Sequence, residues 1–261
     1  MIKFYEVPKL SYRVYYVWLR NLYSYRRFIV STIIGNLGEP VIYLIAMGVG
    51  IGSYMKLTSG EPYLNFIAPG LVVSSVMFAS VYECTFGSFL RMIHEKIYSS
   101  IVSTPISTDE VIMGDILWGT TKAVLSGMIM FLVVMLFGIG SFVKLFPIIL
   151  LMLLVGFLFS SMALIVTALA PNFDFFTYFL TLFVTPMFFF SGIFFPLDEF
   201  PNAVKVVSSF LPLTKAANIS RFIMQGSVLN KNVLYDTFIL IVWGLILYCA
   251  ATLLIRKRLI K

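Results

Sequence analysis

The sequence predicts an all-α integral membrane protein, and its composition and the length of its apolar stretches are the observations that predict it. Apolar residues make up 60% of the chain and charged residues 12%, about half the ~25% charged fraction of a soluble domain. Six stretches are continuously apolar over the roughly 20 residues that a helix needs to cross a bilayer. They lack the alternating pattern of a membrane β-barrel strand. A bundle of six transmembrane helices is therefore expected.

The expected spans share this apolar composition and lie at residues 28–52, 63–89, 109–138, 146–170, 173–195 and 233–255. The first span follows a long basic segment and is too long for the apolar core of a signal peptide, so we expect it to remain in the mature protein. Together with a cytoplasmic tail at 256–261, these segments are expected to form a single transmembrane domain over residues 1–261.

Lys and Arg residues near the ends of the spans predict the orientation of the bundle. If both termini are cytoplasmic, about twice as many of these cations lie on the inner side of the membrane as on the outer side. The formal net charge of +7 is then a positive-inside bias, and we expect no nucleic-acid partner. The expected location is the bacterial cytoplasmic (inner) membrane.

Residues 1–27 precede the first span and are expected to contain an amphipathic helix. Apolar residues from Leu10 to Tyr25 recur at helical spacing, while Arg13 and Arg20 lie on another face. Such a helix suits the plane of the inner lipid headgroups. The alternative is a short basic anchor that only sets the topology.

The segment 90–108, between the second and third spans, is expected to be a cytoplasmic coupling helix. The chain lacks the G-x-x-x-x-G-K-[ST] motif of a phosphate-binding loop, so we expect it to bind no ATP itself. If the chain is a transporter that does not hydrolyse its own fuel, it needs a cytoplasmic segment through which a separate motor can push. The expected contact residues, apolar ones with charged ones around them, are Arg91, Met92, Ile93, Glu95, Lys96 and Ile97.

A few charged residues lie inside the expected spans: Glu39, Glu83, Asp115 and Lys122. Counting ~1.5 Å per residue from the inner boundary places Glu39 and Lys122 roughly 18 Å deep and Glu83 roughly 12 Å deep. Isolated charges at such depth cost several kcal/mol, so we expect Lys122 to pair with Glu83 or Glu39. The absence of further acids leading away from them favours a structural pair over a proton or ion relay.

The segment 196–232, between the fifth and sixth spans, contains prolines and apolar pieces too short to cross a bilayer. We expect half-helices that dip into the outer leaflet and close the outer end of a pathway. Lys215 and Arg221 could meet phosphates of an anionic cargo or the outer headgroups. Four aromatic residues nearby are expected to pack or face lipid, or alternatively to line a path for sugar rings or acyl chains: Phe189, Phe190, Phe194 and Phe195.

Enzymatic chemistry is not expected within this polypeptide. The only histidine, His94, lies in the charged inner loop, and Cys84 and Cys249 both lie inside apolar runs. There is no H-E-x-x-H motif for a metal and no plausible Ser/His/Asp set.

Two groups of motifs occur in a known arrangement. The first surrounds the loop between the second and third spans and consists of Tyr82–Met92, Pro105–Ser107, Gly114–Trp118 and Thr121–Ala123. The second covers the fifth span and the outer segment and consists of Pro171–Tyr178, Thr185–Met187, Phe190–Leu197 and Leu211–Thr214. Glu39-Pro40 also fits. Together they resemble ABC-2 type permeases, in particular the nodulation protein J branch of lipo-oligosaccharide exporters.

The resemblance implies a permease that works as a homodimer, or with a related permease, bound to two separate cytoplasmic ATPase subunits. Those partners would bind ATP and Mg, and this chain would bind no cofactor. The path would lie between the two permease copies, along the first, second and fifth spans, and would carry a lipid-linked oligosaccharide or polysaccharide. The chain departs from the family pattern at Asp115, where a Glu is usual, and at Ala216-Ala217, where a more polar pair is common.

Three other functions compete with this interpretation. A permease for hydrophobic drugs would keep the architecture and change only the cargo. A secondary transporter driven by an ion gradient would need ionisable relays and usually inverted repeats, which the sequence lacks. A membrane enzyme would need a catalytic set.

Overall fold

The computed structural model describes residues 10–26, 38, 41–50, 52, 62–197, 200–226 and 231–259, with Val49 described in its backbone only. Within these ranges every regular element is a helix. Most of the expected first span, including Glu39, lies outside the described residues.

Four helices are long and apolar enough to cross a membrane: Tyr63–His94, Thr108–Leu136, Phe142–Leu169 and Lys231–Leu259. The first of them consists of α3 (Tyr63–Tyr82) and the π-helical turns η3 (Glu83–Gly87) and η4 (Leu90–His94). The others are α5 (Thr108–Leu136), α6 (Leu145–Leu169), which the short turn η5 (Phe142–Lys144) precedes, and α11 (Lys231–Leu259). The chain is therefore an integral membrane protein.

The expected fifth span is a shorter apolar helix, Asp174–Phe190. It consists of α7 (Asp174–Phe179), the π-helical turn η6 (Leu180–Val184) and α8 (Thr185–Phe190). The helix stops before the expected bound at residue 195 because Gly192 has φ +75°, and a Cβ there would lie 2.8 Å from the Leu197 side chain. Only glycine adopts this turn without strain.

Two short helices occupy the segment after the fifth span, α9 (Asn202–Ser209) and α10 (Pro212–Gln225). Pro201 immediately precedes α9 and Pro212 is the first residue of α10, where its missing N–H and fixed φ cost nothing. Gly226, in the left-handed conformation, ends α10.

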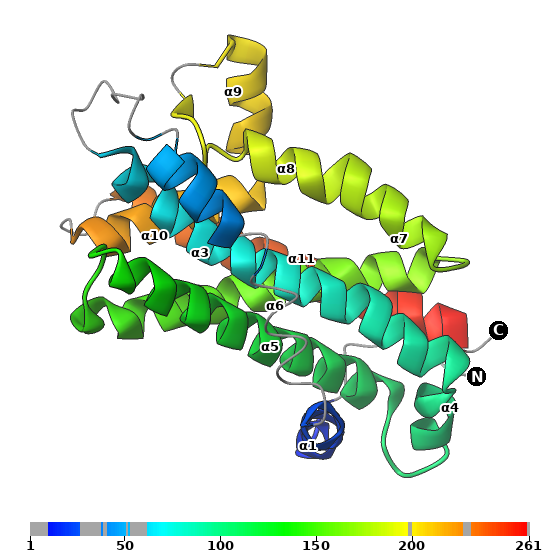
Figure 1. Ribbon diagram of the computed structural model, residues 1–261. Helices are drawn as coiled ribbons and strands as arrows, with labels where there is room; N and C mark the ends of the chain where they lie inside the picture. Colours follow the sequence, from blue (N-terminus) through cyan, green and yellow to red (C-terminus); the bar gives the residue numbers. More distant parts are fainter. Residues whose placement is uncertain are drawn as a thin grey trace.

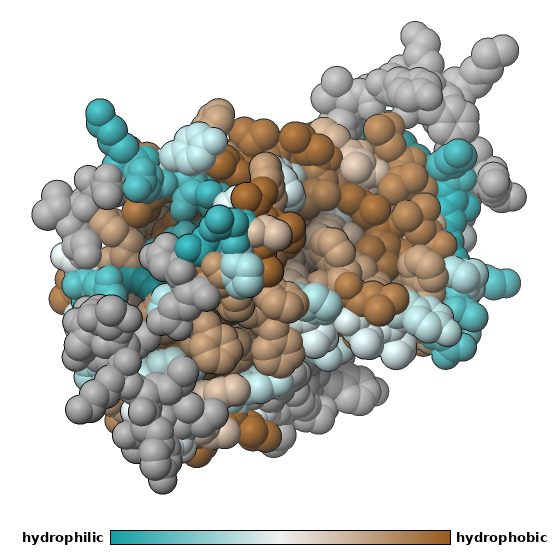
Figure 2. All heavy atoms as spheres, turned by 90° about the horizontal axis from the view of Figure 1, so that it is seen from above, coloured by the Kyte–Doolittle hydropathy of each residue, from teal (hydrophilic) through white to brown (hydrophobic). Residues whose placement is uncertain are grey.

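The core of the bundle is formed by α3, α5 and α6, with α11 packed on α6 and α10 on α3 (Figure 1). A Cβ at Gly127 of α5 would lie 2.5 Å from Val76 of α3 and 3.1 Å from Met152 of α6, so this glycine permits their close approach. Figure 2 shows hydrophobic side chains across the middle of one face and hydrophilic ones toward its two ends.

The two ends of the bundle carry different elements. The short helix α4 (Ile97–Val102), the start of α5 and the C-terminal part of α11 lie together at one end, and α9 and α10 lie toward the other (Figure 1). The helix α1 (Val14–Tyr25) packs against α5. It buries Val14, Val17 and Tyr25 and exposes the opposite face, as an amphipathic helix does.

Candidate functional site

Four charged side chains form a buried cluster near the end of the bundle that carries α4. Lys122 Nζ lies 2.6 Å from Glu83 Oε2, Arg91 Nη1 lies 2.7 Å from Glu83 Oε1, and Arg91 Nη2 lies 3.1 Å from Asp115 Oδ2. The exposed fraction of each side chain is 14% or less. Two cations thus alternate with two carboxylates, so the cluster as a whole is neutral and avoids the cost of an unpaired charge.

Uncharged donors complete the coordination of both carboxylates. Trp118 Nε1 donates to Glu83 over 2.9 Å, and Ser88 Oγ donates to Asp115 over 3.0 Å. The Tyr98 hydroxyl also donates to Asp115. A buried polar network contributes specificity only when its members are satisfied in this way.

Gly87 creates the room for Glu83. It follows Glu83 by one helical turn, and a Cβ at this position would lie 2.9 Å from Glu83 Oε1. Glu83 and Gly87 are the first and last residues of the π-helical turn η3, and Arg91 belongs to the next turn, η4, so both charged side chains come from π-helical turns.

The cluster joins five elements: α1, η3, η4, α4 and α5. Asn21 of α1 donates to Asp115 Oδ1 over 2.6 Å, and Lys122 lies 4.7 Å from the centre of the Tyr25 ring of α1. Tyr98 belongs to α4, whereas Arg91 belongs to η4. Burial, followed by the nearby Asp115 carboxylate, raises the pKa of Tyr98 well above its usual value, so its hydroxyl stays protonated and donates. The Tyr98 hydroxyl thus ties α4 to Asp115 of α5.

The residues expected to dock an ATPase separate into two groups. Arg91 is engaged in the cluster and Met92 is buried, so these two side chains face into the bundle rather than outward. Ile93, Glu95 and Lys96 are exposed, and Ile97 is half-buried. The role of Arg91 and Met92 as contacts for an ATPase stays a prediction, and in this structure Arg91 turns back to a buried carboxylate.

Of the predicted intramembrane charges, the structure brings together Glu83 and Lys122, while Glu39 lies outside the described residues. Sequence reasoning placed Asp115 in the third span but gave it no partner. It also missed the contact between Arg256 of α11 and Asp109 at the start of α5. No sequence signal indicates that pair, because its members are far apart along the chain.

The outer cations are held within the fold. Arg221 donates to the carbonyl oxygens of Phe66, Gly192 and Ile193, and its guanidinium lies 4.0 Å from the centre of the Phe66 ring. Lys215 Nζ lies 2.8 Å from Asp236 Oδ1. The meeting of Arg221 with cargo phosphates or headgroups stays a prediction. In this structure its donors are taken by the carbonyl of Phe66 in α3 and by those of Gly192 and Ile193, just after α8.

Of the four aromatic residues predicted at the outer end, one is buried and three are exposed. Phe194 is fully buried among the rings of Tyr43, Phe188 and Phe189, so it is a packing residue. Phe189 and Phe190 at the end of α8, and Phe195 beyond it, are exposed: their exposed fractions are 38%, 45% and 37%.

No group of His, Cys, Asp and Glu residues that could hold a metal ion occurs in the described part of the chain. Four long apolar helices with a buried, neutral charge cluster at one end define a polytopic membrane protein.

Comparison with known proteins identifies the family. Residues 12–224 match the model of the ABC-2 type transporter family, and the chain belongs to this family. It is 34% identical to nodulation protein J of Rhizobium meliloti (strain 1021), over 93% of this chain and 92% of that protein. It is 32% identical to nodulation protein J of Rhizobium leguminosarum bv. viciae, over 94% of each chain. It is also 26% identical to the inner membrane transport permease YadH of Escherichia coli (strain K12), over 92% of this chain and 93% of that protein. The chain is thus a transport subunit, with no catalytic activity of its own.

Proposed function

We propose that this chain is the permease subunit of an ATP-driven exporter in the bacterial inner membrane, with both termini in the cytoplasm. Its cargo is a lipid-linked oligosaccharide, a polysaccharide or a similar amphiphile. Two cytoplasmic ATP-binding subunits supply the energy and bind ATP and Mg, and a second copy of the chain, or a related permease, completes the path. Membership of the ABC-2 type transporter family and the nearly full-length similarity to nodulation protein J support this assignment.

The observation that carries the mechanism is the tie between the exposed loop and the buried cluster. Ile93, Glu95 and Lys96 are exposed on a segment that contains Arg91 and Tyr98, which both contact Asp115. A push on the exposed residues is transmitted to α5, because Arg91 and Tyr98 on the same segment both contact the Asp115 carboxylate of α5. In this mechanism the coupling segment comprises residues 90–102.

Co-purification and cross-linking test this proposal. The exposed Cys249 is first replaced by Ser, while the buried Cys84 is kept. One new cysteine is then placed at Ile93 or at Leu136, an exposed residue at the opposite end of α5. With a co-expressed ATP-binding subunit, Ile93→Cys should cross-link and Leu136→Cys should not. Reconstituted pairs should then export an amphiphile only when ATP is present.

The absence of any ATPase in the purified complex would contradict the proposal. Cross-linking through α1 alone would contradict the coupling segment but leave the ATP-driven exporter standing.

A further inference from the structure

Five aromatic side chains join the coupling segment and the helix before it to the start of the fifth span. Phe86, Phe89 and His94 lie at the inner end of the second span, and Phe173 and Phe176 lie at the start of the fifth. The centre of the Phe173 ring lies 5.2 Å from that of His94 and 4.9 Å from that of Phe89. The centre of the Phe176 ring lies 5.2 Å from those of Phe86 and Phe89. Aromatic pairs attract one another at these separations, so the five side chains form a ring cluster.

The ring cluster is a different contact from the charge cluster. His94 stacks on Phe173 with the two ring planes 18° apart, and the buried rings of Phe89 and Phe176 meet edge to face beside them. The charge cluster ties the coupling segment to Asp115 of α5. The ring cluster ties it to α7, the first part of the fifth span.

A break in the coupling segment lies between these two contacts. Lys96 has φ +53° and ψ +26°, a left-handed conformation that residues other than glycine seldom adopt. It separates η4, which carries His94, from α4, which carries Tyr98. The segment therefore has two arms, and the ring contact with the fifth span comes from the first of them.

The inner end of the fifth span depends on side chains for its contact with the second span. Apart from its own continuation η6, α7 packs its backbone mainly on α6, the long helix that precedes it in the chain. Helices in a membrane associate through side-chain packing, because lipid tails are as apolar as the helix surface. The rings therefore supply the contact through which a movement of the second span's inner end reaches α7.

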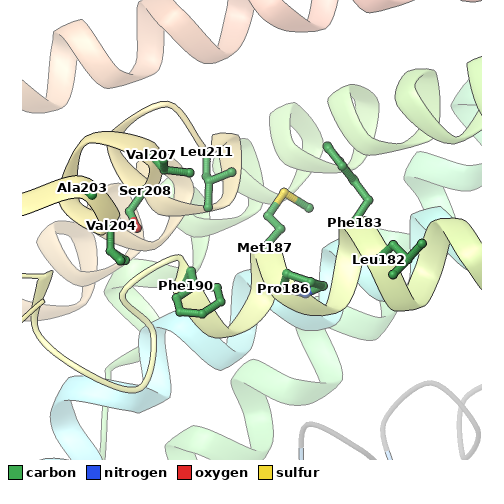
Figure 3. Close-up of a pocket in the computed structure, with 10 residues that line it drawn as sticks. All are labelled: Leu182, Phe183, Pro186, Met187, Phe190, Ala203, Val204, Val207, Ser208 and Leu211. Atoms are coloured by element: carbon green, nitrogen blue, oxygen red, sulfur yellow. The ribbon is translucent and has the colours of Figure 1, made fainter. Parts of the chain in front are cut away.

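The far half of the fifth span borders a cavity. An apolar space of about 390 Å³ lies between it and α9, with Leu182, Phe183 and Met187 on one side and Val207 on the other (Figure 3). The Ser208 hydroxyl of α9 has no hydrogen-bond partner in the described structure, so it does not tie α9 to the span. Apolar contacts are not directional. This half of the span thus has room to shift without breaking a hydrogen bond to α9 in the described structure.

We propose that the ring cluster transmits movement of the coupling segment to the fifth span, with His94 and Phe173 as positioning residues. The proposal rests on the proposed function of an ATP-driven exporter and adds a second branch to its mechanism. Ile93 and Glu95, on either side of His94, are exposed and available to the ATP-binding subunit. Their displacement moves His94 against Phe173, and the fifth span shifts toward the cavity beside α9.

Thermal unfolding of the chain alone in detergent tests the contact without any ATPase. His94→Ala and Phe173→Leu each remove one ring of the same stack, so the double variant should lower the unfolding temperature by less than the sum of the two single effects. Phe175 is half-buried like Phe173 but lies outside the ring cluster. The effects of His94→Ala and Phe175→Leu should therefore add. Additive effects for His94 and Phe173 would overturn the proposal.

A fluorescent reporter tests the transmission itself. The full chain with Cys249→Ser is assembled with the ATP-binding subunit in phosphatidylcholine nanodiscs, and bimane is attached at Leu182→Cys, a position of the fifth span that is 74% exposed. Addition of ATP should change the bimane emission. His94→Ala and Phe173→Leu should each reduce this change several-fold. His94→Phe, which keeps a ring against Phe173, and Phe175→Leu should both retain it.

A second reporter separates the two branches. Bimane at Leu132→Cys of α5, a position that is 46% exposed, should respond to ATP to the same extent with and without Phe173→Leu. Loss of both responses in that variant would overturn a separate branch.

Co-purification of the ATP-binding subunit is measured first, so a missing ATPase counts against the proposed function, whereas the unfolding experiment still tests the ring contact. Once the complex forms, either of two results would overturn the proposal. One is an ATP response at Leu182 that is absent from the unaltered protein or equal in all variants. The other is an equal loss of that response in Phe173→Leu and Phe175→Leu.

Discussion

The two ends of the bundle are stabilised by different kinds of contact. At the end with α4, Lys122, Glu83, Arg91 and Asp115 satisfy one another through side chains. At the end with α9 and α10, Arg221 is satisfied by backbone carbonyls, and α8 meets α9 across an apolar cavity. A network of charged side chains fixes relative positions, whereas an apolar contact around a cavity tolerates rearrangement. In the proposed mechanism it is the first end that transmits force from the ATP-binding subunit.

The largest expected effect comes from unbalancing the charge cluster. Lys122→Met leaves two carboxylates against one cation and should destabilise the protein by ~3–5 kcal/mol, because a buried charge loses its partner. Adding Glu83→Gln restores neutrality and should recover part of this loss. Thermal unfolding in detergent measures both variants. Combining Lys122→Met with Asp236→Asn instead, which acts on a pair in another part of the fold, should give no recovery; recovery there would contradict a local cluster.

Arg221→Met tests whether the opposite end depends on one cation. It removes the donors to three carbonyl groups and should cost ~2–3 kcal/mol, since those acceptors lie away from water. Lys257→Met, at an exposed cation of α11, should stay within ~0.5 kcal/mol. Thermal unfolding of the two variants side by side provides the measurement. Equal stability would mean that the carbonyls find water when Arg221 is absent.

A smaller effect is expected at Gly87. The added methyl group of Gly87→Ala would push against the Glu83 carboxylate and should cost ~1–3 kcal/mol. Gly244→Ala is the matched control, because its nearest contact, a Phe157 side-chain atom at 3.4 Å, is an ordinary van der Waals distance. The unfolding temperature should fall for Gly87→Ala only. An equal fall for both variants would contradict the claim that Gly87 makes room for the Glu83 carboxylate.

The smallest effect is expected at the pair of Lys215 and Asp236. Its side chains are 18% and 11% exposed, more than those of Lys122 and Glu83 at 9% each. The double variant Lys215→Met with Asp236→Asn should change the stability by ~1 kcal/mol or less, since removal of both partners leaves no buried charge unpaired. A change as large as that for Lys122→Met would erase the contrast between the two ends.

The sequence allowed part of this arrangement to be predicted. The depth of Lys122 and Glu83 within apolar runs required a partner for each, and they contact each other. The same argument could not find the role of Arg91, because a residue at a helix end can point either to water or back into the bundle. Ser208 carries no sequence signal at all, since its lack of a partner depends on how α9 meets the fifth span.

The length of the fifth span shows the same limit of prediction from the sequence. Apolar length predicted the helices that contain α3, α5, α6 and α11. It overestimated the length of the fifth span. The helix ends at Phe190 because Gly192 starts a turn, which hydropathy does not register. Turn geometry at a glycine is local, whereas hydropathy averages over a window.

The most direct test of the account is the ratio of cargo exported to ATP hydrolysed in proteoliposomes with the ATP-binding subunit. Tyr98→Phe removes one hydroxyl from the contact between α4 and Asp115, and Tyr178→Phe, at a ring that is 65% exposed, serves as the control. Tyr98→Phe should lower the ratio several-fold while ATPase binding stays unchanged, and Tyr178→Phe should not alter it. A ratio for Tyr98→Phe equal to that of the unaltered protein would contradict transmission of force through the charge cluster.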